Sequence, residues 1–184
     1  MQRSDTELTL FLQSVRCGAL AFTTMRVWDE EVALDLLQEA MIGFAKATRP
    51  DDETIWKALF YKILSRRIAD WQRKQIWRNR ITRIIPFSGL QHDDEDESVD
   101  FAASGGDGDP EQNHSAAQLA KQFEIALAGL PARQQEAYLL RQWQAFSVGE
   151  TAVIMKCSEG SVKTHLSRAM KVLKEQLGEW IDEE

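Results

Sequence analysis

The stretch from Phe146 to Lys174 constrains the fold most, because its apolar residues recur at helical spacing on both sides of a short interruption. Ser147 and Glu150 have the spacing of a capping box, in which each side chain satisfies an unpaired backbone N–H group at the start of a helix. The apolar pattern stops at Lys156–Ser158 and then resumes. The stretch therefore predicts a helix, a tight turn and a second helix.

The polar face of that second helix has the composition of a DNA-reading surface. Short hydroxyl groups and cations lie outside the apolar stripe, and such groups suit base edges and phosphates in a major groove. These residues are Lys163, Thr164, Ser167 and Arg168. An ordinary helical hairpin with a solvated basic face would give the same pattern, because the motif has many look-alikes.

The middle of the chain divides it into two parts. Residues 86–113 contain nine Asp or Glu residues and no Lys or Arg, and they lack apolar periodicity. Such a segment buries too little apolar surface to offset the entropy lost on ordering. We therefore predict an all-α protein in which a flexible acidic linker of roughly 30 Å joins two small helical domains, at residues 1–85 and 114–184. A solvated spacer is the simpler interpretation of the linker; the other is a nucleic-acid mimic in a basic channel.

A net charge of −7 conceals a strongly basic segment. Nine Lys or Arg residues and a single acid, Asp70, lie between Lys57 and Arg83. Because local patches decide nucleic-acid affinity, this segment is a candidate for DNA binding despite the acidic total. Asp70 lies four residues from both Arg66 and Lys74, so we expect it to brace these cations.

Aromatic rings are interleaved with the cations of this segment, which we expect to form a helix over about residues 50–80. Single-stranded nucleic acid favours that mixture, since bases stack on the rings while cations follow the phosphates. The alternative is that the rings belong to the core. We expect core positions for Trp56 and Trp71, and both interpretations stay open for Tyr61 and Trp77.

Helical periodicity also predicts four further helices, at about residues 6–24, 29–44, 116–127 and 132–143. Asp29 can cap the second of these. Along the same helix, Glu31, Asp35 and Glu39 are spaced four residues apart, so their carboxylates line one side. A metal site is conceivable there, but no histidine or second carboxylate cluster accompanies the row. A solvated or partner-docking face is the favoured interpretation.

Several classes of protein fit the sequence poorly. No apolar run approaches the ~20 residues that span a bilayer, and the N-terminus lacks the pattern of a secretory signal. Cys17 and Cys157 lie far apart, without the spacing of a zinc site. A small helical enzyme would need a nucleophile with its base, a phosphate-binding loop or a metal, and none is indicated. We therefore expect a cytoplasmic protein that is not an enzyme, with no catalytic residues, no cofactor and no membrane insertion.

With both halves in view, the chain resembles the extracytoplasmic-function (ECF) group of bacterial sigma-70-type RNA polymerase sigma factors. In the first half, the segments that resemble this group are Asp35–Glu39 (D-L-L-Q-E) and Tyr61–Asp70. In the second half they are Leu130–Arg141, with L-P-x-R near its start, and Gly160–Ala169, which begins G-S-V-K-T. The resemblance covers almost the whole length. Another helix-turn-helix transcriptional regulator would explain the second half but not the basic helix of the first.

The chain departs from the group's pattern at four positions. Leu59 stands where tryptophan is frequent, Gly43 where a cation is frequent, and Arg66 where asparagine is frequent. Arg66 bears on the promoter-melting contacts that the resemblance would assign. Lys156 occupies the turn of the helix-turn-helix, where glycine is frequent, and indicates a strained or residue-tolerant turn.

The resemblance implies that the protein binds RNA polymerase core enzyme and promoter DNA, and that an anti-sigma factor often holds it. It implies that residues 1–85 are region 2, which docks to the polymerase and melts the minus-ten element. Residues 114–184 are then region 4, which reads the minus-thirty-five element, with Arg168 as the best candidate for a guanine contact. Polymerase docking falls to Asp35, Gln38 and Glu39. The expected DNA-binding residues are Lys62, Arg66, Arg73, Lys74, Trp77, Arg78, Lys163, Thr164, Ser167 and Arg168.

Overall fold

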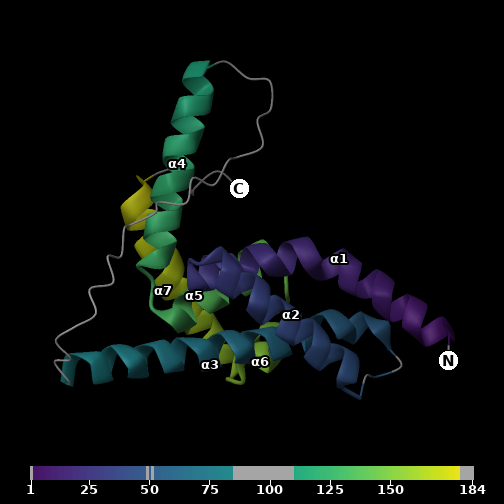
Figure 1. Cartoon of the computed structure of the whole chain (residues 1–184). Helices are drawn as coiled ribbons and strands as arrows, with labels where there is room; N and C mark the ends of the chain where they lie inside the picture. Colours follow the sequence, from purple (N-terminus) through teal and green to yellow (C-terminus); the bar gives the residue numbers. More distant parts are fainter. Residues whose placement is uncertain (1, 49, 51, 85–109, 179–184) are drawn as a thin grey trace.

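The computed structural model describes residues 2–48, 50, 52–84 and 110–178, and all regular structure within these ranges is helical (Figure 1). We call residues 2–84 the N-terminal lobe and residues 110–178 the C-terminal lobe. The N-terminal lobe contains α1 (Gln2–Val27), α2 (Glu30–Lys46), a short 3-10 helix η1 (Glu53–Ile55) and α3 (Trp56–Ile84). The C-terminal lobe contains α4 (Pro110–Ala128), α5 (Ala132–Tyr138), a π-helical turn η2 (Leu139–Trp143), α6 (Val148–Met155) and α7 (Glu159–Leu177). The all-α prediction is confirmed.

Two helix boundaries differ from those expected. Helix α3 continues to Ile84, beyond the expected end near residue 80. Helix α4 begins at Pro110, inside the predicted linker and before the expected start at residue 116. Proline suits the first turn of a helix because its missing N–H group would have no intrahelical partner there. Residues 85–109, which make up most of the predicted linker, lie outside the described residues.

The N-terminal lobe is held together by an aromatic cluster. The ring of Phe11 on α1 lies 5.1 Å from that of Phe44 on α2 and 5.5 Å from that of Trp56 on α3, measured between centroids. Phe60 completes the cluster, 5.8 Å from Phe44 in an edge-on arrangement. The indole Nε1 of Trp56 donates to the main-chain oxygen of Pro50 at 2.8 Å, so its polar group is satisfied although the residue is buried. Three helices are therefore fixed by one set of rings.

Helix α2 begins where the sequence predicts. Asp29 is its N-cap and accepts a hydrogen bond from the backbone N–H of Val32 at 2.9 Å. The helix buries Leu36, Leu37 and Ala40 and exposes the residues between them. This amphipathic pattern places the Asp35–Glu39 segment at the surface of the lobe.

The predicted helix-turn-helix is confirmed in α6 and α7. Both bonds of the capping box are present: Ser147 Oγ accepts from the N–H of Glu150 at 3.2 Å, and Glu150 Oε2 accepts from the N–H of Ser147 at 2.7 Å. Lys156 ends α6 in the left-handed conformation, with φ 53° and ψ 50°. Ser158 then caps α7 by accepting from the N–H of Ser161 at 3.1 Å. Local side-chain chemistry therefore sets each boundary of the motif.

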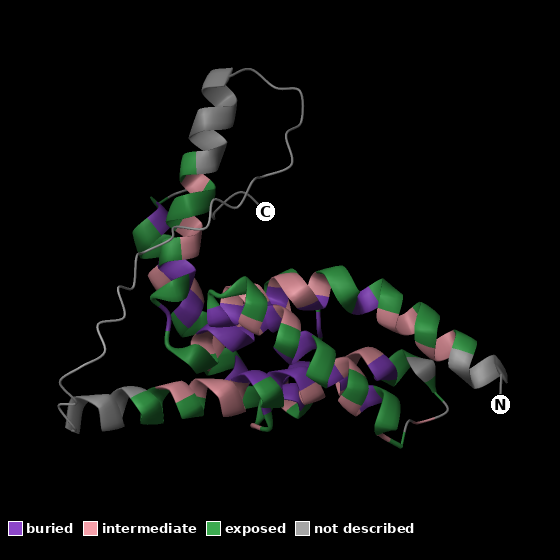
Figure 2. Cartoon of the chain, viewed as in Figure 1, coloured by how far each residue is buried: buried purple, intermediate pink, exposed green. Residues whose placement is uncertain are grey.

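The two lobes are packed against each other. Helix α1 contacts α4 and α5, and α3 contacts α6. Buried residues continue without interruption from one lobe into the other (Figure 2). The sequence had indicated two domains free to occupy separate sites, whereas this arrangement places them in one closed unit.

Helix α1 contains a stretch, Thr6–Val27, that is long and apolar enough by length and composition to cross a membrane. The expectation that no apolar run approaches this length is therefore wrong. Core helices pass the same test, so composition alone is weak evidence for a span. Here α1 buries Val15, Ala19 and Phe22 against its neighbours, and the ring of Phe22 lies 5.4 Å from that of Tyr61 on α3. Its apolar face forms part of the core of this fold.

The left-handed turn gives a prediction about stability. Replacing Lys156 by Gly should raise the free energy of unfolding by about 0.5–1 kcal/mol, because the conformation costs a residue with a Cβ more than the extra entropy that glycine loses on folding. The same replacement at the exposed Lys171, inside α7, should lower it by about 1 kcal/mol. Urea unfolding of both variants would measure the two changes. A loss of stability at both positions would contradict the left-handed conformation of residue 156.

Candidate nucleic-acid interface

Helix α7 presents one apolar face and one polar face. Val162, Ala169 and Leu173 are buried in the C-terminal lobe. Lys163, Thr164, Ser167 and Arg168 are all exposed on its other face, as expected from the sequence. The Thr164 hydroxyl donates to the main-chain oxygen of Gly160 at 2.9 Å, so it can still accept a hydrogen bond from a base or a ligand. This face therefore offers cations and hydroxyl groups to a groove.

The rest of the C-terminal lobe fixes the orientation of this face. Arg133 on α5 donates from Nη2 to the main-chain oxygen of Met155 at 2.8 Å, which ties α5 to the end of α6. Arg141 donates to the main-chain oxygen of Phe146, immediately before the capping box. The hydrogen bonds that Ser147 makes to Glu150 hold the pKa of that carboxyl below its usual value, so the capping residue stays charged near neutral pH.

The C-terminal part of α3 presents the basic face expected from the sequence. Arg66, Arg73, Lys74, Trp77 and Arg78 are exposed, and Lys62 is half-buried. This end of α3 extends away from the region where the lobes meet (Figure 1). Its cations and its indole ring are therefore accessible to a large ligand such as DNA.

Asp70 braces this face, but with a different pair of cations from the expected one. It forms an ion pair with Arg66, at 4.0 Å, and another with Arg73. Arg73, three residues along the helix, takes the place expected for Lys74. All three side chains are largely exposed, so these pairs orient the guanidinium groups without much effect on stability.

The four aromatic residues of α3 separate into two groups. Trp56 is buried and Trp71 packs, half-buried, against the core, as expected. Tyr61 is also buried, and its burial raises the pKa of the phenol well above the usual value. Trp77 is 67% exposed, which leaves its ring free to stack on a base. The two residues that the sequence left open therefore fall on opposite sides: Tyr61 in the core and Trp77 on the surface.

The residues expected to dock to a polymerase share the exposed face of α2. Asp35, Gln38 and Glu39 are all exposed. Glu39 Oε2 pairs with Nη1 of Arg67 on α3 at 3.2 Å, so one of the carboxylates is partly neutralised. Because both partners are exposed, a docking cation could replace Arg67 at little cost. Within the described residues, no group of three His, Cys, Asp or Glu side chains is placed to hold a metal ion.

The sequence missed the residues that join the lobes. The side chain of Gln144, after η2, is buried between α1 and α3, and Glu136 on α5 is buried beside Arg26 of α1. Lys57, counted with the basic segment, donates to the main-chain oxygen of Gln144 at 2.9 Å. Its ammonium group also lies 4.8 Å from the centroid of the Phe146 ring. The start of α3 therefore serves the contact between lobes, and its later turns carry the exposed cations.

Comparison with known proteins assigns the C-terminal lobe to a family. Residues 114–173 match the family described as sigma-70, region 4. This range includes the helix-turn-helix and α5, together with most of α4.

Relatives match over most of the chain. The RNA polymerase sigma factor SigV of Bacillus subtilis is 31% identical over 161 residues, which cover 86% of this chain and 82% of the relative. An RNA polymerase sigma-E factor of Streptomyces coelicolor is 26% identical over 164 residues, covering 88% of this chain and 81% of the relative.

A solved structure has a similar fold over the whole length. It is the sigma factor RpoE from Bartonella quintana, crystallised in complex with the anti-sigma factor NepR. The match has a TM-score of 0.67 at 25% identity and covers 98% of this chain and 99% of the other. Its all-α architecture, the helix-turn-helix and the similarity to these relatives agree: the chain belongs to the sigma-70 family of RNA polymerase sigma factors, in the ECF group.

Proposed function

We propose that this protein is a sigma factor that directs RNA polymerase to specific promoters. The observation that carries the proposal is the exposed polar face of α7, presented by a fully capped helix-turn-helix in the part of the chain that matches region 4. The second surface, on α3, supplies cations and an exposed indole ring. Two DNA-binding surfaces in one chain suit a protein that recognises two promoter elements.

We assign one promoter element to each half of the chain. Residues 1–85 are region 2, where the α3 surface contacts the minus-ten element as it melts, with Trp77 stacking on an unpaired base. Residues 114–184 are region 4, where α7 enters the major groove of the minus-thirty-five element. Residues 86–113 connect the two and allow them to reach separate sites.

The protein's partners follow from this role. The α2 face formed by Asp35, Gln38 and Glu39 docks to RNA polymerase core enzyme, and the polymerase carries out the chemistry of RNA synthesis. This protein contributes specificity and makes or breaks no bond. RpoE was crystallised with the anti-sigma factor NepR, which supports an anti-sigma factor as a further partner. The site of action is the cytoplasm, where promoter DNA and polymerase meet.

Transcription in vitro tests the proposal directly. Core enzyme and the purified chain are combined on a library of promoter fragments, and transcript ends are mapped. We expect a small set of start sites that share sequences at the minus-ten and minus-thirty-five positions. Transcripts identical to those of core enzyme alone would refute the proposed function.

Arg168 should supply base discrimination. Replacing it by Ala should remove about 1–3 kcal/mol of preference at one base position, because a guanidinium can bind guanine in a bidentate manner. Lys171→Ala is the matched control, since it removes one exposed cation from the same helix. The control should weaken binding equally on all sequences, as expected for a phosphate contact. Competition binding on single-base promoter variants would measure both, and an unchanged preference in Arg168→Ala would remove this residue from the reading face.

The acidic face of α2 should govern polymerase binding. The double variant Asp35→Lys and Glu39→Lys should weaken binding to core enzyme at least tenfold, because it reverses two charges at the proposed contact. Glu124→Lys with Glu175→Lys makes the same change of net charge in the other lobe and should leave affinity within about twofold. Titration with labelled core enzyme, with circular dichroism as a check on folding, would compare them. Equal losses in both variants would point to total charge and away from a docking face.

A further inference from the structure

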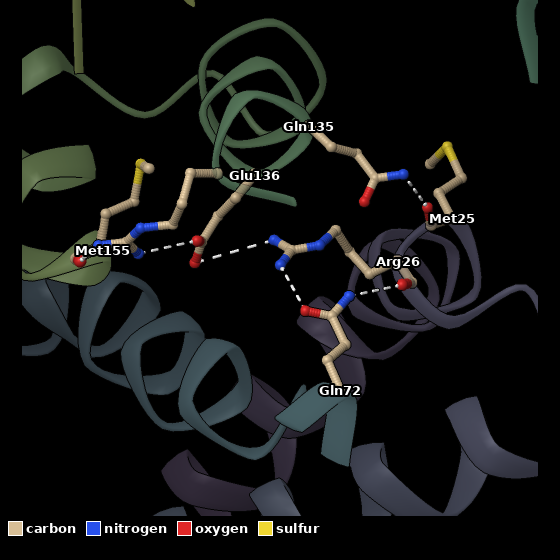
Figure 3. A network of polar contacts seen from close by, with 7 residues as sticks. Met25, Arg26, Gln72, Gln135, Glu136 and Met155 are labelled. Carbon is tan, nitrogen blue, oxygen red and sulfur yellow. Dashed lines mark hydrogen bonds and ion pairs between the residues drawn. The ribbon is translucent and has the colours of Figure 1, made fainter. Parts of the chain in front are cut away.

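A buried polar contact joins α1 of the N-terminal lobe to α5 of the C-terminal lobe (Figure 3). The side chain of Arg26 is only 2% exposed, and its Nη1 lies 3.8 Å from Oε1 of Glu136, whose side chain is 5% exposed. Its Nη2 donates to Oε1 of Gln72 on α3 at 3.5 Å. Beside this pair, Gln135 donates from Nε2 to the main-chain oxygen of Met25 at 2.9 Å. We call these contacts the arginine cluster.

A second set of contacts is centred on Gln144. Its Nε2 donates to the main-chain oxygen of Gly18 on α1 at 3.0 Å, and its Oε1 accepts from the Tyr61 hydroxyl on α3 at 2.6 Å. Its main-chain oxygen accepts from Nζ of Lys57. The ring of Phe146 lies 5.1 Å from the ring of Tyr61, edge-on. One short loop of the C-terminal lobe thus makes polar and aromatic contacts with two helices of the other lobe; we call it the glutamine cluster.

The arginine cluster is incompletely satisfied. Nε and Nη1 of Arg26 have no hydrogen-bond acceptor among the described residues, and the contact to Glu136 is longer than a hydrogen bond. Burial lowers the pKa of the Arg26 guanidinium, and the charge of Glu136 opposes that effect. A buried pair of this kind offers little net stability, although removing one partner is costly because it leaves the other charge buried alone. The contact therefore holds the lobes together weakly, and only while both charges are present.

The closed arrangement is incompatible with binding both promoter elements at once. These elements lie about 25 base pairs apart by name, which is roughly 85 Å of duplex at 3.4 Å per base pair. All 29 residues of α3 span only about 44 Å. Since α3 lies against α6 in the closed arrangement, the lobes must part before both elements can be bound.

We propose that the arginine and glutamine clusters form a reversible latch, which keeps the free chain closed and limits its binding to promoter DNA. The inhibitory part of this proposal rests on the proposed function; the closed conformation itself does not. Opening hydrates Arg26 and Glu136 separately and releases Lys57 and Tyr61 from the second lobe. Any partner that binds the separated lobes then shifts the equilibrium toward the open form.

The variant Glu136→Gln tests the arginine cluster. It leaves Arg26 buried without a counter-charge in the closed form only, because in the open form water can solvate the guanidinium. The population should therefore shift toward the open form. The double variant Arg26→Met and Glu136→Met replaces the pair by apolar groups of similar size, and it should close again, since such replacements are often neutral or stabilising.

The variant Tyr61→Phe tests the glutamine cluster independently. It removes the hydroxyl that bonds to Gln144 and keeps the ring. Tyr138→Phe is the matched control, because Tyr138 lies on α5 beside Phe123, 6.1 Å away in the same lobe. Only Tyr61→Phe should favour the open form.

Distances between spin labels measure opening directly. Labels are placed on Gln13→Cys in α1 and Lys171→Cys in α7, both exposed sites, with Cys17 replaced by Ser and Cys157 by Ala. We expect one narrow, short distance for the otherwise unaltered chain, a long and broad distribution for Glu136→Gln and Tyr61→Phe, and the short distance again for the double Met variant and the Tyr138 control. A long distance before any latch substitution, or no change in both Glu136→Gln and Tyr61→Phe, would overturn the latch.

Binding of a two-element promoter fragment by the free chain tests the inhibitory role. Glu136→Gln should increase affinity at least about fivefold, and Tyr138→Phe should leave it unchanged. Opening without any gain in affinity would overturn the inhibitory role. If opening is seen but the chain directs no transcription with core enzyme, the proposed function fails while the latch stands.

Discussion

Helix α3 packs on two sides, and the arrangement of the whole molecule depends on this. Phe60 faces the rings of α1 and α2, and Tyr61, the next residue, faces Phe22 of α1 and Phe146 of the C-terminal lobe. Burying both sides of the first turns fixes the direction of the helix. Its last turns project as a basic arm with an exposed indole ring. One element therefore sets the core, the contact between lobes and the position of a DNA-binding surface.

The features predicted correctly from sequence are those determined within a few residues. Ser147 and Glu150 announce the start of α6 because both capping bonds are formed between residues three apart. Asp29 announces α2 in the same way. The exposed faces of α2 and α7 follow from apolar periodicity, so the candidate site residues could be placed on surfaces before the structure was known. Trp56 could be assigned to the core because it lies on the apolar stripe of its helix.

The contact between the lobes could not be predicted in this way. Gln144 looks like an ordinary polar residue at the end of a helix, and its partners Gly18 and Tyr61 are more than 80 positions away in the chain. Arg26 and Glu136 would each be expected at the surface, since a charged residue is rarely fully buried unless paired, and no local pattern identifies the partner. The acidic composition of residues 86–113 indicated separation of the lobes. Composition describes the connection but not what its ends do.

The closed arrangement affects DNA binding through geometry, because it leaves the cations accessible. Lys163 and Arg168 on α7, and Arg73 and Arg78 on α3, are exposed while the lobes are in contact. Each surface can therefore meet DNA alone, with the modest affinity of a single contact. Two linked sites bind 10²–10⁴-fold more tightly than one only if both can be engaged together, and this gain is lost when geometry forbids it. A latch that holds the lobes together thus removes the advantage of having two surfaces without hiding either. Because Arg26 and Glu136 are poorly satisfied when buried, the free energy needed to separate them is small compared with the gain from engaging both elements. The same imperfect burial that makes the contact look unfavourable is therefore what allows it to be reversible.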